Sequence, residues 1–231
     1  MDRARLYFRR TIEFCKIGNP DFAKLIDATD LHDLDNFHKL FESHLELLYT
    51  SKKTDLTKLR EIYAIEKEKV KHRDSEETVT KLYESEKTQT LQRESMLKMD
   101  FIQLLNINLI KNPAITTYES DWEWIVKEEN LYLFDVKKIQ KAAQKDHFFL
   151  FERTGTYNGF LDTNIFEYPL NEYEYILLEI FEKAMTGSNA INKFFGLFVT
   201  ETKDEEQQFF GLSEKLLRNL IFKRFVVKKD G

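Results

Sequence analysis

A change of pattern near residue 147 constrains the fold more than any other feature of this sequence. His147, Phe148, Phe149 and Phe151 form an aromatic-rich run bounded by Thr154 and Gly155, the composition of a β-strand that leads into a turn. Apolar residues at helical spacing follow between residues 171 and 222. Strands followed by helices predict a small mixed module rather than a further helical bundle.

Glycine and charge divide the chain in a similar way. Only Gly18 occurs before residue 155, and the other six glycines lie from residue 155 onward, where turns are needed. Residues 1–112 hold 20 Lys/Arg and 20 Asp/Glu, whereas residues 113–231 hold 15 and 20. We therefore expect an α+β protein with a helical domain over residues 1–112 and a second domain over residues 113–231.

The first half carries amphipathic patterns throughout. They predict helices over 3–16, 21–27, 33–50 and 55–72. Leu97, Phe101, Leu104, Leu105 and Leu109 predict a last helix that ends before Pro113. The very polar stretch 66–95 is interpreted either as a solvated helix or as a mobile connector. Together these segments predict an N-terminal helical bundle.

The second half predicts strands and then helices. Trp122, Trp124 and Val126 alternate with charged residues, which indicates an extended segment, and a helix is expected over 134–145. Three strands are expected at 147–153, 160–161 and 164–168, with a turn at 157–159. The last of them should end at Pro169, which cannot donate to a ladder. Helices over 171–185, 189–195 and 205–222 and a strand over 225–227 complete the module. The residues expected to cap these helices are Asn171, Ser188 and Asp204.

No pattern in the sequence points to catalysis or to a metal site. His32, His38 and His44 are six residues apart, so they turn by about 240° each time and share no helix face. We interpret them as surface and boundary residues of an amphipathic helix. Neither an HExxH motif, a CxxC pair nor a glycine-rich phosphate loop occurs. Cys15, the single cysteine, excludes an intramolecular disulfide and should be a small core residue. We expect no catalytic residue, no metal ligand and no enzymatic activity.

The location expected from the sequence is cytoplasmic. The apolar runs are far shorter than the roughly 20 residues that span a bilayer. The basic start, MDRARLYFRR, is not followed by the apolar segment of a signal peptide.

One stretch supports a resemblance to a known family. LFERTGTYNGFLDTNIFEYPLNEYEYILLEIFEKAMTGSNAINKFF resembles the PqqD-like, winged-helix recognition element of systems that modify ribosomally made peptides. In that family three strands precede three helices. A helical N-terminal domain before this element is similar to the family of the methanobactin C protein, the partner proteins of multinuclear iron peptide oxidases.

The resemblance implies a binding mode and a partner. The leader of a precursor peptide would add as a strand beside the third strand and pack against the third helix. The corresponding peptide-binding residues are Asn164, Ile165, Phe166, Glu167 and Tyr168, together with Lys215, Arg218 and Phe222. The N-terminal helices would bind the peptide-modifying enzyme in a heterodimer. Iron is expected in that enzyme, and no cofactor is expected in this chain.

Two alternatives stay open at this point. A winged-helix DNA-binding transcriptional regulator with a helical dimerisation domain is one, and an enzyme without a visible motif is the other. The third helix begins with Asp204, Glu205 and Glu206, which would repel phosphate at the end that usually enters the groove. The later basic residues, Lys215 and Arg218 among them, either meet acidic leader residues or are solvated positions that complement the helix C-terminus. Peptide binding is therefore favoured.

Overall fold

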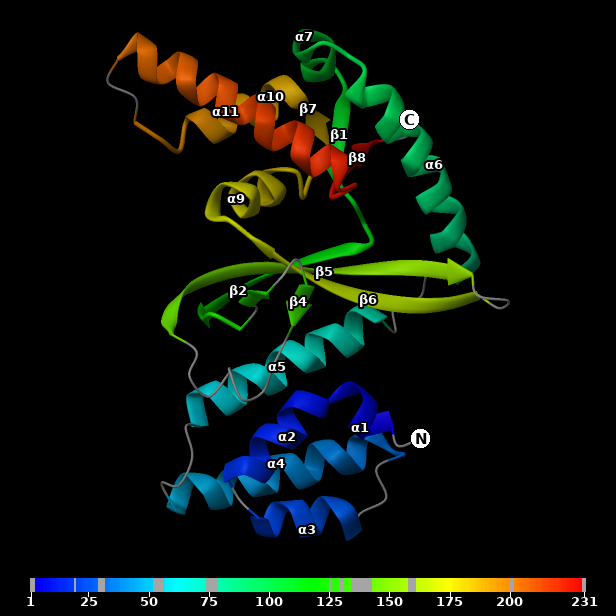
Figure 1. Cartoon of the computed structure of the whole chain (residues 1–231), viewed down its shortest axis with the longest axis vertical. Coiled ribbons are helices and arrows are strands. Elements are labelled where there is room, and N and C mark those ends of the chain that lie inside the picture. The colour runs from blue at the N-terminus through cyan, green and yellow to red at the C-terminus, as the bar shows by residue number, and fades with distance from the viewer. Residues whose placement is uncertain are drawn as a thin grey trace. The chain divides into compact units, whose positions relative to one another are not determined.

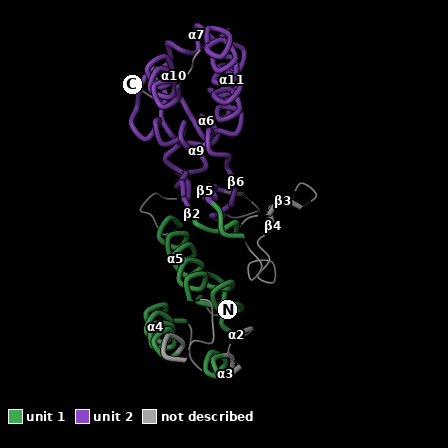
Figure 2. The backbone as a smooth tube through the Cα atoms, turned by 90° about the vertical axis from the view of Figure 1, so that its left-hand side faces the viewer, with its two compact units in different colours: residues 1–75, 120–145 green, residues 76–119, 146–231 purple. Residues whose placement is uncertain are grey.

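The computed structural model describes residues 3–18, 20–28, 32–51, 56–73, 79–124, 126–128, 131–133, 143–157, 161–199 and 202–229. These residues form an α+β fold of helices and small antiparallel sheets (Figure 1). The chain divides into two compact units, shown in Figure 2. Unit 1 holds residues 1–75 and 120–145, and unit 2 holds residues 76–119 and 146–231. Each unit is discontinuous in sequence, whereas the sequence predicted one boundary after residue 112.

Unit 1 is built on helices at its N-terminal end. They match the predicted segments within about two residues, except that the first one is interrupted at Phe8. The elements of this unit are α1 (Arg3–Tyr7), α2 (Arg9–Gly18), α3 (Pro20–Ala28), α4 (Leu34–Ser51), α5 (Leu56–Arg73) and the hairpin of β3 (Val126–Glu128) with β4 (Leu131–Leu133).

A buried carboxylate explains the interruption of the first helix. Glu66 of α5 accepts hydrogen bonds from the backbone N–H of Arg10 at 3.0 Å and of Thr11 at 3.0 Å, and from the Thr11 hydroxyl at 2.8 Å. The first N–H groups of a helix have no partner within it, so this carboxylate caps α2 from another helix. Burial raises the pKa of Glu66, and these hydrogen bonds oppose that rise.

Aromatic rings fill the core of unit 1. Phe8 lies 4.9 Å from Phe37 between ring centroids, and Phe41 lies 4.2 Å from Tyr63. His44 is buried and stacks on Phe22 at 4.0 Å. The interpretation of the three histidines as surface and boundary residues is therefore wrong for His44, which is a core residue. Cys15 is buried as predicted, and burial next to Glu66 raises the pKa of its thiol.

Unit 2 joins a long helix, two sheets and three C-terminal helices. Its elements are α6 (Val79–Leu97), α7 (Phe101–Leu105), β1 (Asn108–Lys111), β2 (Ile115–Trp122), β5 (Gln144–Tyr157), β6 (Leu161–Leu170), α9 (Glu172–Ile180), β7 (Met185–Thr186), α10 (Gly187–Phe195), α11 (Lys203–Phe222) and β8 (Val226–Lys228). Two of its strands extend into unit 1, which holds residues 120–122 at the end of β2 and residues 144–145 at the start of β5. One sheet has the order β7-β1-β8 and the other β2-β5-β6.

Residues 79–95 of the very polar stretch belong to the helix α6. This agrees with the interpretation as a helix rather than as a mobile connector. The helix predicted through Leu109 is wrong, because α6 ends at Leu97 and Asp100 starts the short helix α7 with a capping box to Gln103. Leu109 lies on β1, where it pairs with Met185 of β7 and Lys228 of β8. Pairing with strands far along the chain overrides a locally helical pattern here.

The strands expected between 147 and 168 form one hairpin. β6 is a single strand from Leu161 to Leu170, not two, and β5 already begins at Gln144. The helix predicted over 134–145 is therefore wrong at Gln144 and Lys145, and its residues 134–142, like most of the turn at 157–159, lie outside the described residues. Pro169 does not end β6 but pairs opposite Phe149.

The three C-terminal helices are confirmed, with one shorter than predicted. Asn171 caps α9 as expected, accepting from the Glu174 N–H at 2.9 Å. The helix ends at Ile180 rather than 185, because Met185 and Thr186 pair with β1 and Thr186 then caps α10. The N-cap of α11 is Thr202 and not Asp204. No helix among the described residues is long and apolar enough to cross a membrane.

Candidate functional site

The outer edge of β6 presents backbone hydrogen-bonding groups. Arg153 of β5 donates its backbone N–H to the Ala114 carbonyl at 2.8 Å, so this amide points away from β6. In an antiparallel ladder such a residue forms a non-hydrogen-bonded pair, and its partner's N–H and C=O also point away. The partner of Arg153 is Ile165. The N–H and C=O of Ile165 therefore face the outer edge of β6, and neither has a hydrogen-bond partner within the described residues.

The same alternation explains why a proline is tolerated inside this strand. Gly155 donates its N–H to Glu86 at 2.8 Å, again away from β6, and its partner is Thr163. Every second residue from Thr163 onward, which includes Pro169, then directs its backbone outward. Since β6 is the last strand of the described sheet, the missing N–H of Pro169 removes no bond to β5.

The side chains of β6 divide between two faces. Asn164, Phe166 and Tyr168 share one face with Glu152 and Leu150 of β5, whereas Ile165 and Glu167 share the other with Arg153 and Phe151. Phe166 is 46% exposed and lies 6.4 Å from the Tyr168 ring. Tyr168 in turn lies 5.4 Å from Phe225, and the Lys223 ammonium is 5.6 Å from the Phe225 ring. An aromatic row thus leads from the edge of β6 to the end of α11.

Arg224, directly after α11, takes a backbone conformation that usually belongs to glycine. Its φ is 62°, and it is the only non-glycine residue with positive φ in the described part of the chain. Arg224 N–H bonds to the Ile221 carbonyl at 2.9 Å and Phe225 N–H to the Leu220 carbonyl at 2.8 Å. These two bonds define a Schellman motif, whose left-handed position costs a non-glycine residue about 1–2 kcal/mol. The arginine side chain therefore needs a compensating contact.

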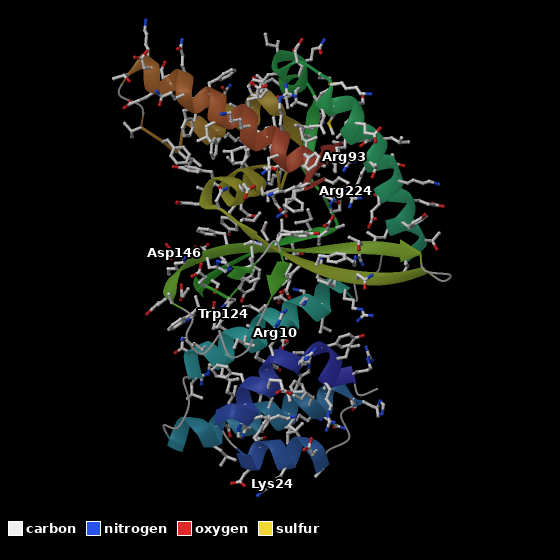
Figure 3. All side chains as sticks on the ribbon, in the orientation of Figure 1. Arg10, Lys24, Arg93, Trp124, Asp146 and Arg224 are labelled. Carbon is white, nitrogen blue, oxygen red and sulfur yellow. The ribbon has the colours of Figure 1, made fainter. Side chains whose placement is uncertain are left out.

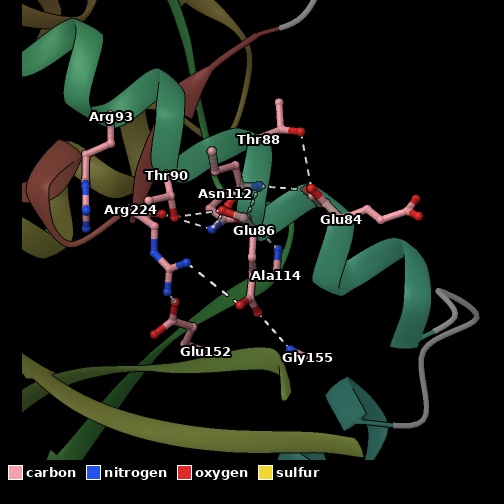
Figure 4. Close-up of polar contacts among 12 residues, drawn as sticks. Glu84, Glu86, Thr88, Thr90, Arg93, Asn112, Ala114, Glu152, Gly155 and Arg224 are labelled. Atoms are coloured by element: carbon pink, nitrogen blue, oxygen red, sulfur yellow. Dashed lines mark hydrogen bonds and ion pairs between the residues drawn. The ribbon is translucent and has the colours of Figure 1, made fainter. Parts of the chain in front are cut away.

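That contact is a pair of carboxylates, drawn in Figure 4. Arg224 Nη2 lies 3.5 Å from Glu152 Oε1, and Nη1 lies 3.8 Å from Glu86 Oε2. The Arg224 carbonyl accepts from the side-chain amide of Asn112 at 2.9 Å. Arg93, also near the end of α11 in Figure 3, donates to the Phe222 carbonyl at 3.5 Å. The end of α11 is thus tied to α6 and to the β5–β6 hairpin by charge.

Burial dominates the protonation of both carboxyl groups. It raises the pKa of Glu152, where Arg224 and a hydrogen bond from Tyr168 pull it down and Glu86 adds to the rise. Burial also raises the pKa of Glu86, against the Gly155 N–H and Arg224. With two carboxylates around one arginine, the cluster carries a formal negative charge when both are ionised. The net charge of this cluster therefore changes with pH as Glu86 and Glu152 gain or lose protons.

The structure brings only some of the predicted peptide-binding residues together. Tyr168 meets the end of α11 through Phe225, and Phe222 is 62% exposed there, 5.8 Å from the Arg93 guanidinium. Arg218 instead bonds to Glu214 at 2.8 Å and to the Met99 carbonyl at 3.1 Å. Lys215 is exposed on α11. The sequence did not point to Glu86 and Glu152 as partners of Arg224, although a lone glutamate inside the apolar run of β5 was a usable signal.

The histidines form no site with one another. His38 Nδ1 lies 2.5 Å from the Tyr63 hydroxyl, His44 is buried, and His32 is exposed. Within the described ranges no group of three or more His, Cys, Asp or Glu side chains is arranged to hold a metal ion.

No protein-family model matches the chain, and no curated protein or solved structure matches it significantly.

Proposed function

We propose that this chain is a non-catalytic peptide-binding subunit. It takes the leader of a ribosomally made precursor as an added strand on the outer edge of β6 and presents it to a peptide-modifying, iron-dependent enzyme. The observation that carries the proposal is the outward-facing backbone of Ile165, which has no partner in the part of the chain that the structure describes, beside the exposed ring of Phe166. Strand addition needs such an edge for main-chain bonds and neighbouring pockets for side chains.

The proposed binding mode is centred on Ile165 and limited by Pro169. A peptide strand would exchange main-chain bonds with Ile165, while its side chains on one face would contact Phe166. Pro169 offers only a carbonyl outward, so pairing would lose a donor at that end. Backbone bonds would give affinity with little sequence preference, and the aromatic row would select apolar leader residues.

The winged-helix assignment belongs to the same proposal. In unit 2, α9, β7, α10, α11 and β8 follow in the order of helix, strand, helix, helix and strand, with β7 and β8 flanking β1. The first turn of α11 carries Asp204, Glu205 and Glu206, all exposed. This negative end disfavours the alternative, a DNA-binding regulator, because phosphate contacts need Lys and Arg.

Unit 1 would bind the partner enzyme. Three leucines on separate helices of this unit are exposed: Leu6 by 51%, Leu25 by 45% and Leu47 by 68%. Gathered into one contiguous patch, such side chains would give the enzyme a docking surface. The setting we propose is the cytoplasm, where a single unpaired cysteine is ordinary.

Amide hydrogen exchange tests the peptide-binding mode. The probe is the leader segment of a short peptide encoded next to this gene, where sequencing of the neighbouring reading frames finds one, added to the isotope-labelled chain. We expect the Ile165 amide to exchange quickly in the free chain and at least about tenfold more slowly in the complex, because it would gain a strand hydrogen bond. Saturating peptide binding without slower exchange at Ile165 would overturn this mode. Tight, salt-dependent binding of duplex DNA by the free chain would support the regulator instead.

A further inference from the structure

A pocket lies within unit 2, and its lining residues come from other elements than β6. It has a volume of about 430 Å³ and is bounded by one face of α6, the segment after β1, and the end of β8. The lining residues of α6 recur at three- and four-residue steps from Lys81 to Gln92, so they belong to one face of that helix. A pocket of this volume is within the usual range for bound ligands and much larger than an inorganic ion requires.

The inner wall of the pocket is a fixed layer of amides. Asn112 donates to Gln89 Oε1 at 3.1 Å and accepts from the Ala114 N–H at 3.0 Å. Gln89 in turn donates to the Ser85 hydroxyl oxygen at 3.0 Å. Because Asn112 is 2% exposed and fully bonded, this wall is preorganised. The Ser85 hydroxyl still has its own proton to donate to a ligand.

The side chains that line the pocket carry a net positive charge, whereas the whole protein is negatively charged. Three lysines line it, Lys81, Lys228 and Lys229, against one acid, Glu84. The whole chain has a formal charge of −5. Lys228 and Lys229 are exposed and make no ion pair within the described residues. Lysines concentrated around a pocket of an acidic chain indicate an anionic ligand.

The edge of β8 supplies main-chain groups beside these lysines. Asn112 donates its N–H to the Phe225 carbonyl and Lys229 donates to the Asn108 carbonyl, both at 2.9 Å. Residues 225, 227 and 229 therefore turn their backbone toward β1. By the alternation of the ladder, the N–H and C=O of Lys228 point away from β1. Since β8 is the last strand of this sheet, they face its open edge, next to the pocket.

We propose that this pocket binds an acidic, extended peptide segment. Carboxylates of the segment contact Lys228 and Lys229, and its main chain pairs with the outward backbone of Lys228. Charge selects an anion, while the strand edge and the pocket's length along α6 favour a peptide over a compact anion. The proposal rests on the proposed peptide-binding function and gives it a second surface, one that selects acidic sequence.

Fluorescence anisotropy with a labelled peptide of alternating glutamate and valine tests it. Matched probes carry glutamine or lysine in place of glutamate, and sodium phosphate is a competitor at constant ionic strength. The test variants are the double substitution Lys228→Gln/Lys229→Gln and Thr88→Trp, which fills the pocket from an exposed position of α6. The matched control is Lys193→Gln/Lys203→Gln, two exposed lysines elsewhere in unit 2 with the same change of charge.

We expect the glutamate peptide to bind more tightly than either matched probe. The double pocket variant should weaken binding by about threefold to tenfold, the worth of two exposed ion pairs. Thr88→Trp should weaken it too, and the control should not. Equal loss in the control, no preference for glutamate, or displacement by millimolar phosphate would each overturn the proposal.

A β6 variant separates this proposal from the proposed function. If Phe166→Ala abolishes binding of the precursor while the pocket variants leave it unchanged, the β6 mode stands and the pocket proposal fails. If the pocket variants weaken binding and Phe166→Ala does not, the pocket stands and the β6 mode fails.

Discussion

The guanidinium of Arg224 lies 3.5 Å from the carboxylate of Glu152, and this contact joins the end of α11 to the middle of β5. The same arginine occupies the left-handed position of a Schellman motif, where glycine would be free of strain. Local backbone preference and long-range charge pairing therefore compete at one residue. If the ion pairs outweigh the strain, arginine is more stabilising than glycine at this position.

Arg224→Gly should measure this competition. Glycine relieves about 1 kcal/mol of backbone strain, but it leaves Glu86 and the buried Glu152 without their cation. We expect a net loss of about 2 kcal/mol in the free energy of unfolding at neutral pH. Chemical denaturation followed by circular dichroism measures it, with Arg224→Lys as the control that keeps a charge. A variant as stable as the wild type would show that the network contributes nothing.

Glu152→Gln should change how stability depends on pH. The pKa of Glu152 is raised in the folded chain, so its contribution to stability is fully present below its unfolded pKa and is lost as pH rises through the folded pKa. The wild type should therefore lose stability relative to Glu152→Gln between about pH 4 and neutral pH. Denaturation curves of both proteins across this range give the difference. If the wild type instead gained stability relative to Glu152→Gln as pH rises, the pKa of Glu152 would be lowered by folding and not raised.

Glu66→Ala tests the cap of α2. The substitution removes the buried acceptor of three hydrogen bonds. The donors are the backbone N–H groups of Arg10 and Thr11 and the hydroxyl of Thr11. We expect a loss of about 2–4 kcal/mol in unfolding free energy, whereas Glu66→Gln, which keeps one acceptor oxygen, should lose less. Glu68→Ala on the same helix is the control, because Glu68 makes only an exposed pair with Lys71. Urea titration of the three variants is sufficient.

Local signals predicted the helices of this chain well and its strands less well. Caps such as Asn171 and apolar stripes such as that of α4 are properties of neighbouring residues, and they appear in the structure nearly as expected. Leu109 and Met185 were misassigned to helices because each lies in a strand that forms by pairing with residues far along the chain. Pro169 was misread because its effect depends on which way its backbone faces, and that is set by the register with Phe149.

The candidate site divides in the same way. Asn164–Tyr168 could be placed at a strand edge from its sequence pattern and the resemblance. The partners of Arg224 could not, because Glu86 and Glu152 reach it from a helix and a strand far apart in the chain. Arg218 was assigned to the peptide from the resemblance and from its charge, and the structure gives it partners in Glu214 and Met99.

Paired proline substitutions on β6 test the direction of its backbone. Ile165→Pro removes an N–H that faces the outer edge, so the hairpin should survive, as it does with Pro169 at an equivalent position. Phe166→Pro removes an N–H that faces Glu152 of β5, which should cost about 3 kcal/mol or more and open the ladder. Thermal unfolding and far-ultraviolet circular dichroism compare the two. Peptide affinity is then measured only for folded Ile165→Pro, where we expect a loss of about tenfold from one missing main-chain bond. Greater destabilisation by Ile165→Pro than by Phe166→Pro would show that the ladder alternates in the other sense. Full affinity in a folded Ile165→Pro would remove Ile165 from the peptide-binding edge.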